Sequence, residues 1–497
     1  MSDIRVTYSG LVSFVLGLAG IFTGLIFTLV VTRTLTVIEY GTWNLIYGLI
    51  FYVIIFEPVF SYWATRNIAR GVDAGKTAVL SSGLFSIGGI FAYIIISYFV
   101  GQQTNINQNY ILFAAILIPL IFLNRTLSAI NMGWKPHAVS YGTFAFGVSQ
   151  IPLALIFIYL LNMGVYGVIL TIVFAYLVSI AVLSIYAKTK IKNTFKKELL
   201  TKWLKLFWLP LYPAISSILY WSDLVIFSVI VGSVIGVAFW SAAMVISSLI
   251  AHSALISRAV YPKLLGSNNI EYIKENLTQL FYFAIPLTAL AITFARPALF
   301  ALNPEYEIAT SVVIFTSIFV FLNTLSTVFH SFLTGIEKVD INEKSTFKDY
   351  IKSKLFFLPT LLLVQNGVYV SLLAVGLLIL TNIVSSQLEL VIYWSILALV
   401  TQIPFTVYHY ALVKRNFVSP FDYVVFKYLL VSIGTFGLVY IITEQFLDYK
   451  NNVFEFLPDL LLFVGLAIVS YLAITYLIDF RTKKLFKSII EEIRSKF

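Results

Sequence analysis

Residues 164–187 read GVYGVILTIVFAYLVSIAVLSIYA, and residues 188–205, which follow them, read KTKIKNTFKKELLTKWLK. The first stretch has no charged side chain and is long enough to cross about 30 Å of hydrocarbon as a helix. The second stretch is rich in lysine, as loops on the cytoplasmic side of a membrane are. The pair predicts a membrane-spanning helix followed by a basic, amphipathic connector that faces lipid headgroups. A regulatory or partner-binding connector is the alternative.

The same pattern extends over the whole chain. Its 497 residues are 60% hydrophobic and only 11% charged, and the mean hydropathy is +0.93. A soluble chain of this length would need far more charge to cover its surface. Because lipid offers no partner to unpaired backbone groups, every apolar window should be a helix. Fourteen windows are long enough to span a bilayer: 7–32, 40–64, 78–100, 109–131, 138–161, 164–187, 205–231, 234–257, 274–300, 306–335, 354–380, 386–413, 423–446 and 456–479.

The lysine and arginine residues predict the orientation of these windows. If the N-terminus is cytoplasmic, all but three of the 33 lysines and arginines fall at inner ends or loops. The three at outer ends are Arg33, Arg296 and Lys450. We therefore predict a multi-pass protein of the cell membrane with both termini in the cytoplasm. The formal net charge of +10 then serves orientation in an anionic membrane, and we expect no nucleic acid as a partner.

The sequence offers no recognisable site for a metal or a cofactor. It contains no cysteine, and its four histidines, His137, His252, His330 and His409, lack the spacing of metal ligands. No glycine-rich phosphate loop follows a predicted strand, which excludes an ATP-driven pump in one chain. An integral-membrane glycosyltransferase or polymerase commonly carries outer carboxylates, whereas the predicted outer loop 101–109 has none. We therefore expect no enzyme, no metal and no cofactor.

The basic connector also divides the chain into similar halves. Gly41-Thr42-Trp43 begins the second window, and Gly236-Val237-Ala238-Phe239-Trp240 begins the eighth; Arg66 and Arg258 lie near the ends of the same two windows. Two six-span halves share one topology, so they would be parallel repeats with a substrate path between them. The predicted parts are an N-lobe (1–187), the connector (188–204), a C-lobe (205–413), two further spans (414–480) and a basic cytoplasmic tail (481–497).

Five passages carry a family resemblance that runs in order along spans one to twelve. They are Thr32-Arg33-Thr34-Leu35 with Glu39-Tyr40-Gly41, Arg66-Asn67-Ile68-Ala69-Arg70-Gly71, Trp221-Ser222-Asp223-Leu224 with Gly232 and Gly236, Tyr261-Pro262-Lys263-Leu264, and Asn303-Pro304-Glu305-Tyr306. In them the chain resembles the polysaccharide or O-antigen-type (Wzx-like) flippases of the multidrug/oligosaccharidyl-lipid/polysaccharide (MOP) exporter superfamily. Two departures weaken a peptidoglycan-precursor cargo: Glu57 stands where relatives keep small residues, and the first span lacks the arginine of lipid II flippases.

The resemblance implies both an architecture and a cargo. The fold would be all-α, with two six-helix lobes around a central cavity that opens alternately to each side, plus two C-terminal helices. The cargo would be a lipid-linked oligosaccharide on undecaprenyl or dolichyl (pyro)phosphate. Expected partners are this glycan, membrane lipids, protons or sodium ions as coupling ions, and glycan assembly enzymes. A cation or drug antiporter of the same superfamily is the alternative, but such proteins usually have twelve spans.

Charged residues inside or beside the predicted spans are the candidate site residues, since an ionised group at mid-bilayer costs about 2.5–3.5 kcal/mol. Arg125 offers a fork of donors that suits a phosphate, with snorkelling or an ion pair as the alternative. Arg66, Arg70 and Arg258 are further candidates for the cargo phosphate. Their alternative role is to anchor span ends by the positive-inside rule.

Three more titratable residues are candidates for ion coupling or for lining a polar cavity. Glu57 precedes Pro58, which removes a backbone donor, so a proton or cation site is one interpretation. The other is an ion pair with Arg66 or with an arginine of another helix. Asp223 matches a recurring aspartate of the resembled family, which favours a cavity position. His252 is a candidate relay, with simple packing as the alternative.

Two prolines and a set of aromatic residues complete the candidates. Pro210 and Pro213 would break the start of the seventh span twice and form a hinge, or would simply end a helix. Aromatic side chains could stack on sugar rings, or belong to the interfacial belts of the membrane. These aromatic residues are Tyr212, Tyr220, Trp221, Trp240 and Tyr408.

The predicted topology is testable with reporter fusions. Fusions after Lys192 and Lys344 should read cytoplasmic, and a fusion after Asn107 should read external, because the lysines and arginines concentrate on the inner side. Alkaline phosphatase and green fluorescent protein activities measure the two sides. An external signal at Lys192 would contradict the fourteen-span topology.

Overall fold

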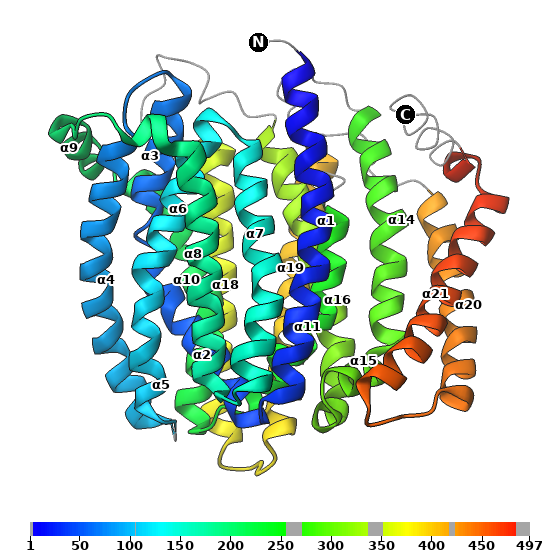
Figure 1. Cartoon of the computed structure of the whole chain (residues 1–497). Helices are drawn as coiled ribbons and strands as arrows, with labels where there is room; N and C mark the ends of the chain where they lie inside the picture. The colour runs from blue at the N-terminus through cyan, green and yellow to red at the C-terminus, as the bar shows by residue number, and fades with distance from the viewer. Residues whose placement is uncertain (1–2, 105, 255–270, 336–350, 417–422, 484–497) are drawn as a thin grey trace. The chain divides into compact units, whose positions relative to one another are not determined.

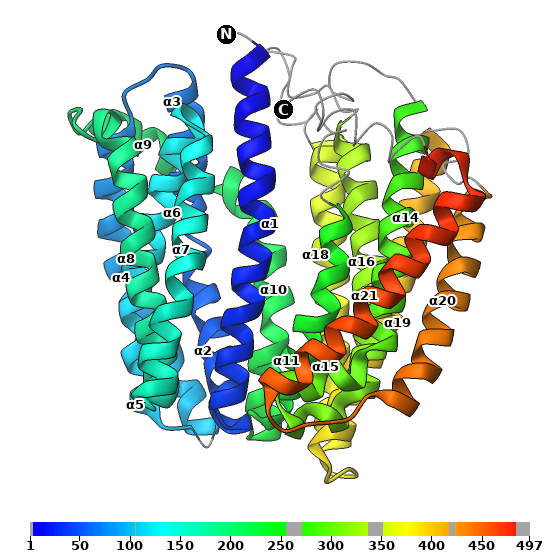
Figure 2. The same ribbon diagram turned by 45° about the vertical axis from the view of Figure 1, so that its right-hand side comes forward.

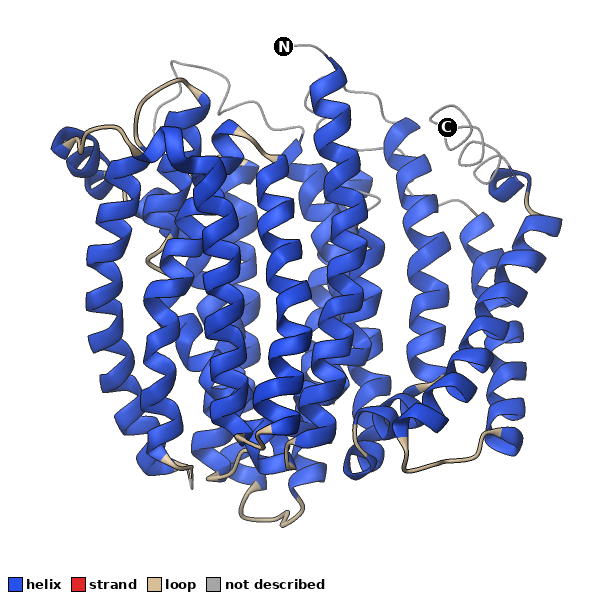
Figure 3. Ribbon diagram, viewed as in Figure 1, coloured by secondary structure: helices blue, strands red, loops and turns tan. Residues whose placement is uncertain are grey.

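The structure is a computed structural model that describes residues 3–104, 106–254, 271–335, 351–416 and 423–483. Throughout these ranges the regular elements are helices, without a strand (Figure 3). Thirteen helices are long and apolar enough to cross a membrane, and the described side chains of the first helix add a shorter apolar segment, Phe22–Thr34. The described part of each of the fourteen predicted windows is mainly helical, so the all-α, polytopic fold class is confirmed.

The chain forms two compact units. Unit 1 comprises Met1–Ala238 with Asn366–Gln387, and unit 2 comprises Phe239–Gln365 with Leu388–Phe497. The boundaries of these units differ from the boundaries of the predicted N-lobe and C-lobe. The lobe boundaries stay a prediction.

Unit 1 is built mainly from long helices joined by short turns (Figure 1). The largest contacts within it join α7 to α8 and to α1, and α6 to α8 and to α3. Its complete helices are α1 (Asp3–Thr34), α2 (Val37–Ile54), α3 (Pro58–Ala69), α4 (Gly75–Gln103), α5 (Gln108–Phe113), α6 (Leu117–Trp134), α7 (His137–Ala154), α8 (Gly164–Ile191), α9 (Lys197–Lys205) and α10 (Trp208–Val231).

Two of the predicted windows are wrong as single helices. Window 40–64 is broken at Glu57, where α2 has ended and α3 begins with Pro58. Window 274–300 is broken at Phe294, and Pro297 lies in the first turn of the helix that follows. Proline has no N–H to donate, so it fits the first turn of a new helix better than the middle of an old one.

The start of α2 is fixed by a short cap and a close backbone contact. The Thr36 side chain accepts from the Glu39 N–H, and the Glu39 carboxylate accepts from the Thr36 N–H at 3.0 Å. Four residues into the helix, Gly41 lies against the carbonyl group of Val234, where any Cβ would clash. The glycine that begins the predicted second span is therefore required by close approach of two backbones.

The basic connector contains an amphipathic helix, while its position at the lipid headgroups stays a prediction. Helix α9 exposes its lysines, whereas Trp203 is 1% exposed and belongs to a hydrophobic cluster that includes Phe60, Ile130 and Leu183. The backbone N–H of Lys196 donates to the Thr77 hydroxyl at 2.9 Å, which ties the connector to the start of α4. The connector is thus packed onto unit 1 through its apolar face.

Unit 2 contains the remaining helices and the two C-terminal spans (Figure 2). Helices α18 and α11 each contribute residues to both units, and α19 places its first residue in unit 1. The helices are α11 (Ile235–Ser247), α14 (Glu271–Thr293), α15 (Ala295–Leu302), α16 (Thr310–Gly335), α18 (Lys354–Leu380), α19 (Gln387–Asn416), α20 (Val424–Phe446) and α21 (Val453–Ile478).

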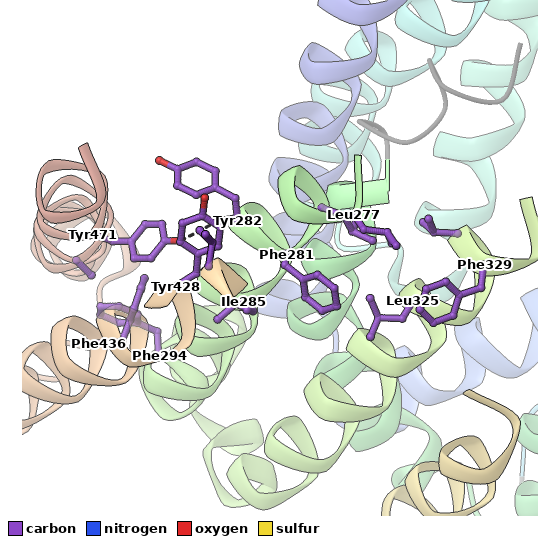
Figure 4. Packing of buried hydrophobic residues seen from close by; sticks show 14 of the residues in the cluster. Leu277, Phe281, Tyr282, Ile285, Phe294, Leu325, Phe329, Tyr428, Phe436 and Tyr471 are labelled. Carbon is purple, nitrogen blue, oxygen red and sulfur yellow. Dashed lines mark hydrogen bonds between the residues drawn. The ribbon is translucent and has the colours of Figure 1, made fainter. Parts of the chain in front are cut away.

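A tyrosine-rich core fixes the two C-terminal spans to α14 (Figure 4). Tyr282 of α14 lies 5.1 Å from Tyr428 and 5.7 Å from Tyr471, measured between ring centroids. At the end of α21, Asp479 accepts from the Tyr428 hydroxyl at 2.9 Å and from Thr482. Burial alone would raise the pKa of the Asp479 carboxyl, but these hydrogen bonds hold it below its ordinary value. The two extra helices are therefore an integral part of unit 2.

Candidate functional site

The break between α2 and α3 places a carboxylate inside unit 1. Glu57 is 2% exposed, and its carboxylate accepts a hydrogen bond from the Ser61 hydroxyl at 3.2 Å and one from the Thr126 hydroxyl at 3.4 Å. The Thr126 hydroxyl also lies 2.8 Å from the Ser82 hydroxyl of α4. Hydroxyl groups of α3 and α6 thus bind this buried carboxylate, and the Ser82 hydroxyl of α4 adjoins one of them.

Arg125 is the cation that interacts electrostatically with Glu57. It is half-buried on α6, and it forms no ion pair with a carboxylate among the residues that the structure describes. Its two neighbours are bonded elsewhere, since Asn124 donates to Ser179 of α8 at 2.8 Å and Thr126 faces Glu57. The Arg125 guanidinium therefore keeps its fork of donors available to a ligand.

The predicted pairing of Glu57 with Arg66 is wrong. Arg66 is exposed near the end of α3, where its guanidinium donates to the Tyr62 hydroxyl at 2.6 Å and lies 4.9 Å from the centre of that ring. Arg70 is also exposed and caps the same helix. The alternative partner, an arginine of another helix, is what the structure places near Glu57.

Asp223 forms a second buried carboxylate of unit 1. Its side chain on α10 is 3% exposed, and it accepts from the Tyr369 hydroxyl at 2.9 Å and from the Leu224 N–H at 2.8 Å. Tyr52 of α2 and Tyr220 of α10 also lie close enough to interact with it electrostatically. No cationic side chain forms an ion pair with Asp223 in the described part of the chain.

Residues of α18 complete this second site, and the sequence analysis missed them. Tyr369 bonds Asp223, and Asn366 donates to the Ser216 carbonyl oxygen at 2.8 Å. The signal was present, because Gln365, Asn366 and Gly367 interrupt an otherwise apolar window. Instead of breaking the helix, Asn366 binds α10, and α18 is continuous from Lys354 to Leu380.

An aromatic series connects the surroundings of the two carboxylates within unit 1. Arg125 interacts electrostatically with Tyr176 of α8, and Tyr176 does so with Tyr47 of α2. The Tyr47 ring lies 5.8 Å from Trp221 of α10, and Phe51 lies 5.3 Å from the same indole. Tyr47 is 43% exposed, so the series includes accessible ring surface on the same unit as Arg125. We call Arg125, Tyr176, Tyr47, Phe51 and Trp221 the arginine–aromatic series.

The remaining candidates belong to unit 2 or lie outside the described residues. His252 is half-buried in unit 2, and a ring nitrogen lies 3.2 Å from the Ser248 carbonyl oxygen one turn earlier. Arg258 lies outside the residues that the structure describes. In the described residues no group of three or more histidine, cysteine, aspartate or glutamate side chains could hold a metal ion.

The two prolines do not break α10. Pro210 lies in its first turn, where a missing N–H leaves no hydrogen bond unmade, and Pro213 lies inside a helix that continues to Val231. The Ser216 hydroxyl donates to the Pro213 carbonyl oxygen at 2.8 Å. The predicted double break is therefore wrong, while a hinge at these prolines stays a prediction.

No protein-family model matches the sequence, and no curated protein matches it. Solved structures do. A multidrug resistance MATE family transporter of the MOP superfamily, in an inward-facing conformation, superposes with a TM-score of 0.60 at 15% identity, over 80% of this chain and 95% of that one. The lipid II flippase MurJ, in an inward closed conformation, superposes with a TM-score of 0.64 at 16% identity, over 97% of this chain and 100% of that one.

The chain has the fold of the MOP superfamily transporters. A MATE structure in the straight conformation gives a TM-score of 0.52 at 15% identity, over 83% of this chain and 96% of that one. The expected MATE-like architecture is thereby confirmed as a fold. At these identities the likeness concerns the fold alone and assigns no role to individual residues.

The hydrogen bond between Tyr369 and Asp223 makes a prediction about stability. Tyr369→Phe should lower the free energy of unfolding by about 1–3 kcal/mol, because a buried carboxylate loses its side-chain donor. Thermal unfolding in detergent measures the change. Tyr98→Phe is the matched control, since the Tyr98 side chain is 53% exposed on α4 of the same unit. Equal effects of the two substitutions would contradict a stabilising role for the Tyr369 hydroxyl.

Proposed function

We propose that the chain is a membrane transporter that flips a lipid-linked oligosaccharide across the cell membrane by alternating access. The fold supports transport, and the superposition with a lipid II flippase over 97% of this chain supports a lipid-linked cargo. The C-terminal helices α20 and α21 pack on α14. They exceed the twelve spans that are usual for cation or drug antiporters, which also favours a lipid-linked cargo. In this proposal the termini are cytoplasmic, and membrane lipids and glycan assembly enzymes are the partners.

The observation that carries the proposal is the arginine–aromatic series of unit 1. A guanidinium without a carboxylate partner suits a phosphate, which accepts its parallel N–H donors in a bidentate arrangement. Accessible aromatic rings suit the apolar faces of sugars. Unit 1 therefore offers guanidinium donors for a phosphate at Arg125 and aromatic surface for a sugar at Tyr176 and Tyr47. Exposed Arg66 and Arg70 are candidates for an earlier contact with the same phosphate, and so is Arg258.

The coupling ion is proposed to act at a buried carboxylate. Glu57 and Asp223 are both at most 3% exposed, and each is bonded by hydroxyl groups. A carboxyl group in such a place can bind a proton or a sodium ion. The ion shifts the transport equilibrium only if its affinity differs between the two conformations. His252, bonded within its own helix, is the weaker candidate.

One observation favours a second function, transport of an organic cation or drug by the same fold. Asp223 is a buried carboxylate without an ion-paired cation among the described residues, which is what a cationic substrate requires. The two functions differ in the charge of the cargo. Vesicles that contain the protein separate them, since a flippase moves the lipid-linked glycan and an antiporter moves the cation against a proton or sodium gradient.

The role of Arg125 makes a prediction about cargo charge. Arg125→Ala should slow flipping of a lipid-linked oligosaccharide about tenfold to hundredfold, the loss expected for hydrogen bonds to a charged group. Arg125→Lys should keep part of the rate, because a point charge replaces the fork. Reconstituted vesicles with a fluorescent cargo measure the rate, with Lys202→Ala on exposed α9 as control. Full activity of Arg125→Ala at normal protein level would remove this residue from the site.

The role of Glu57 makes a prediction about the driving force. Glu57→Gln keeps the shape of the side chain but removes its negative charge and its titration. Flipping by the variant should therefore no longer respond to an imposed proton or sodium gradient that accelerates the wild type. Asp223→Asn, measured in the same vesicles, tests the other carboxylate. A wild type that ignores every gradient, or a Glu57→Gln variant that responds as the wild type does, would make Glu57 a structural residue.

A further inference from the structure

A group of lysine and aromatic side chains lies at one end of unit 1, where Gly133, next to Trp134, packs against the end of α3. The Lys190 ammonium lies 4.4 Å from the centre of the Trp134 ring. The Lys135 ammonium lies 5.9 Å from the same ring and 6.0 Å from the Tyr186 ring. We call Trp134, Lys135, Tyr186 and Lys190 the lysine–aromatic cluster. Two ammonium groups thus share one aromatic surface, at a distance typical of cation–π contacts.

The cluster carries positive charge without a counter-charge in the described part of the chain. Neither Lys135 nor Lys190 forms an ion pair with a carboxylate there. Both ammonium groups lie within 5.9 Å of the centre of the same Trp134 ring, so they are close to each other. Like charges held this close repel one another, so an anion between them would be stabilised.

The position of the cluster points to the membrane surface. Trp134 is the last residue of the candidate span Gln108–Trp134 and is 44% exposed, and Lys190 lies in the last turn of the candidate span Gly164–Ile191. Tryptophan and lysine side chains at span ends lie at the level of the lipid headgroups. The cluster therefore presents two ammonium groups and an indole at the depth of the lipid phosphates.

We propose that the lysine–aromatic cluster is a binding site for the headgroup of an anionic phospholipid. The lipid phosphate lies between the Lys135 and Lys190 ammonium groups, and the Trp134 indole packs against the glycerol and the first methylenes of the chains. The site shares no residue with the arginine–aromatic series. It also includes Lys190, which lies in the last turn of α8 and at the start of the basic connector that leads to α9 and α10. The bound lipid therefore holds the start of that connector at the membrane surface.

Native mass spectrometry of the purified full chain tests the site. Phosphatidylglycerol and phosphatidylcholine of equal chain length are titrated separately, and the number of retained lipids is counted. We expect one phosphatidylglycerol to bind in preference to phosphatidylcholine. Lys135→Gln combined with Lys190→Gln should weaken this binding about twenty-five-fold, because each lysine near an anionic surface contributes about fivefold. Trp134→Leu should weaken it as well, although it removes no charge.

The matched control removes the same charge from the same unit but not from the aromatic surface. Lys196→Gln combined with Lys202→Gln changes two exposed lysines of the connector and α9. This control should keep the bound phosphatidylglycerol. Equal loss in the control and the Lys135/Lys190 variant would show diffuse charge attraction and overturn the site. Equal retention of phosphatidylcholine, or displacement of the lipid by inorganic phosphate at millimolar concentration, would overturn it too. Thermal unfolding of each variant is measured in parallel. Where it is unchanged, loss of phosphatidylglycerol is due to the substituted side chains and not to unfolding.

Discussion

A bilayer offers no hydrogen-bond partner to a peptide N–H or C=O, and the architecture of this chain follows from that constraint. Long helices satisfy it internally, which is why regular structure in the described residues is helical. The interruptions are therefore the informative places. At Glu57 the break comes directly before Pro58, which has no N–H, and the Glu57 N–H donates to the Ile54 carbonyl oxygen at 2.9 Å. The loss of helical bonds is thus limited to one turn.

That turn has a chemical consequence, because it holds a carboxylate where a regular helix would usually carry an apolar side chain. Glu57 has two hydroxyl donors, and Asp223 has one hydroxyl and one backbone donor. Neither carboxylate forms an ion pair in the described part of the chain. Contacts of this kind are compatible with a neutral or an ionised carboxyl group, whereas a tight ion pair would stabilise only the charged form. Hydroxyl and backbone donors hold a carboxyl group in place without fixing its charge. Both groups are therefore suited to exchange a proton or a cation.

The fold was largely predictable from the sequence, because hydropathy and the distribution of lysine and arginine depend on the chain alone. The contacts of the candidate site were less so. Arg66 and Arg125 are both arginines near the inner ends of predicted spans. Arg66 stacks on Tyr62 four residues earlier, whereas Arg125 of α6 interacts with Glu57 at the start of α3. The partner of Asp223, Tyr369, is 146 residues away, and nothing local to either residue indicates the pairing. Helix packing decides such contacts, and they cannot be predicted from the spacing of residues along one helix.

Three consecutive residues of α6 illustrate what this packing demands. Asn124 binds Ser179 of α8, Thr126 faces Glu57 and Ser82, and Arg125 lies between them. Successive side chains of a helix point about 100° apart. The rotation of the helix about its axis therefore decides which neighbour each side chain contacts. One residue inserted or deleted earlier in α6 would rotate the set by that angle and present the wrong side chain to every partner. This segment can therefore vary among homologous chains by substitution, but changes of its length should be confined to the turns before Gln108 and after Trp134.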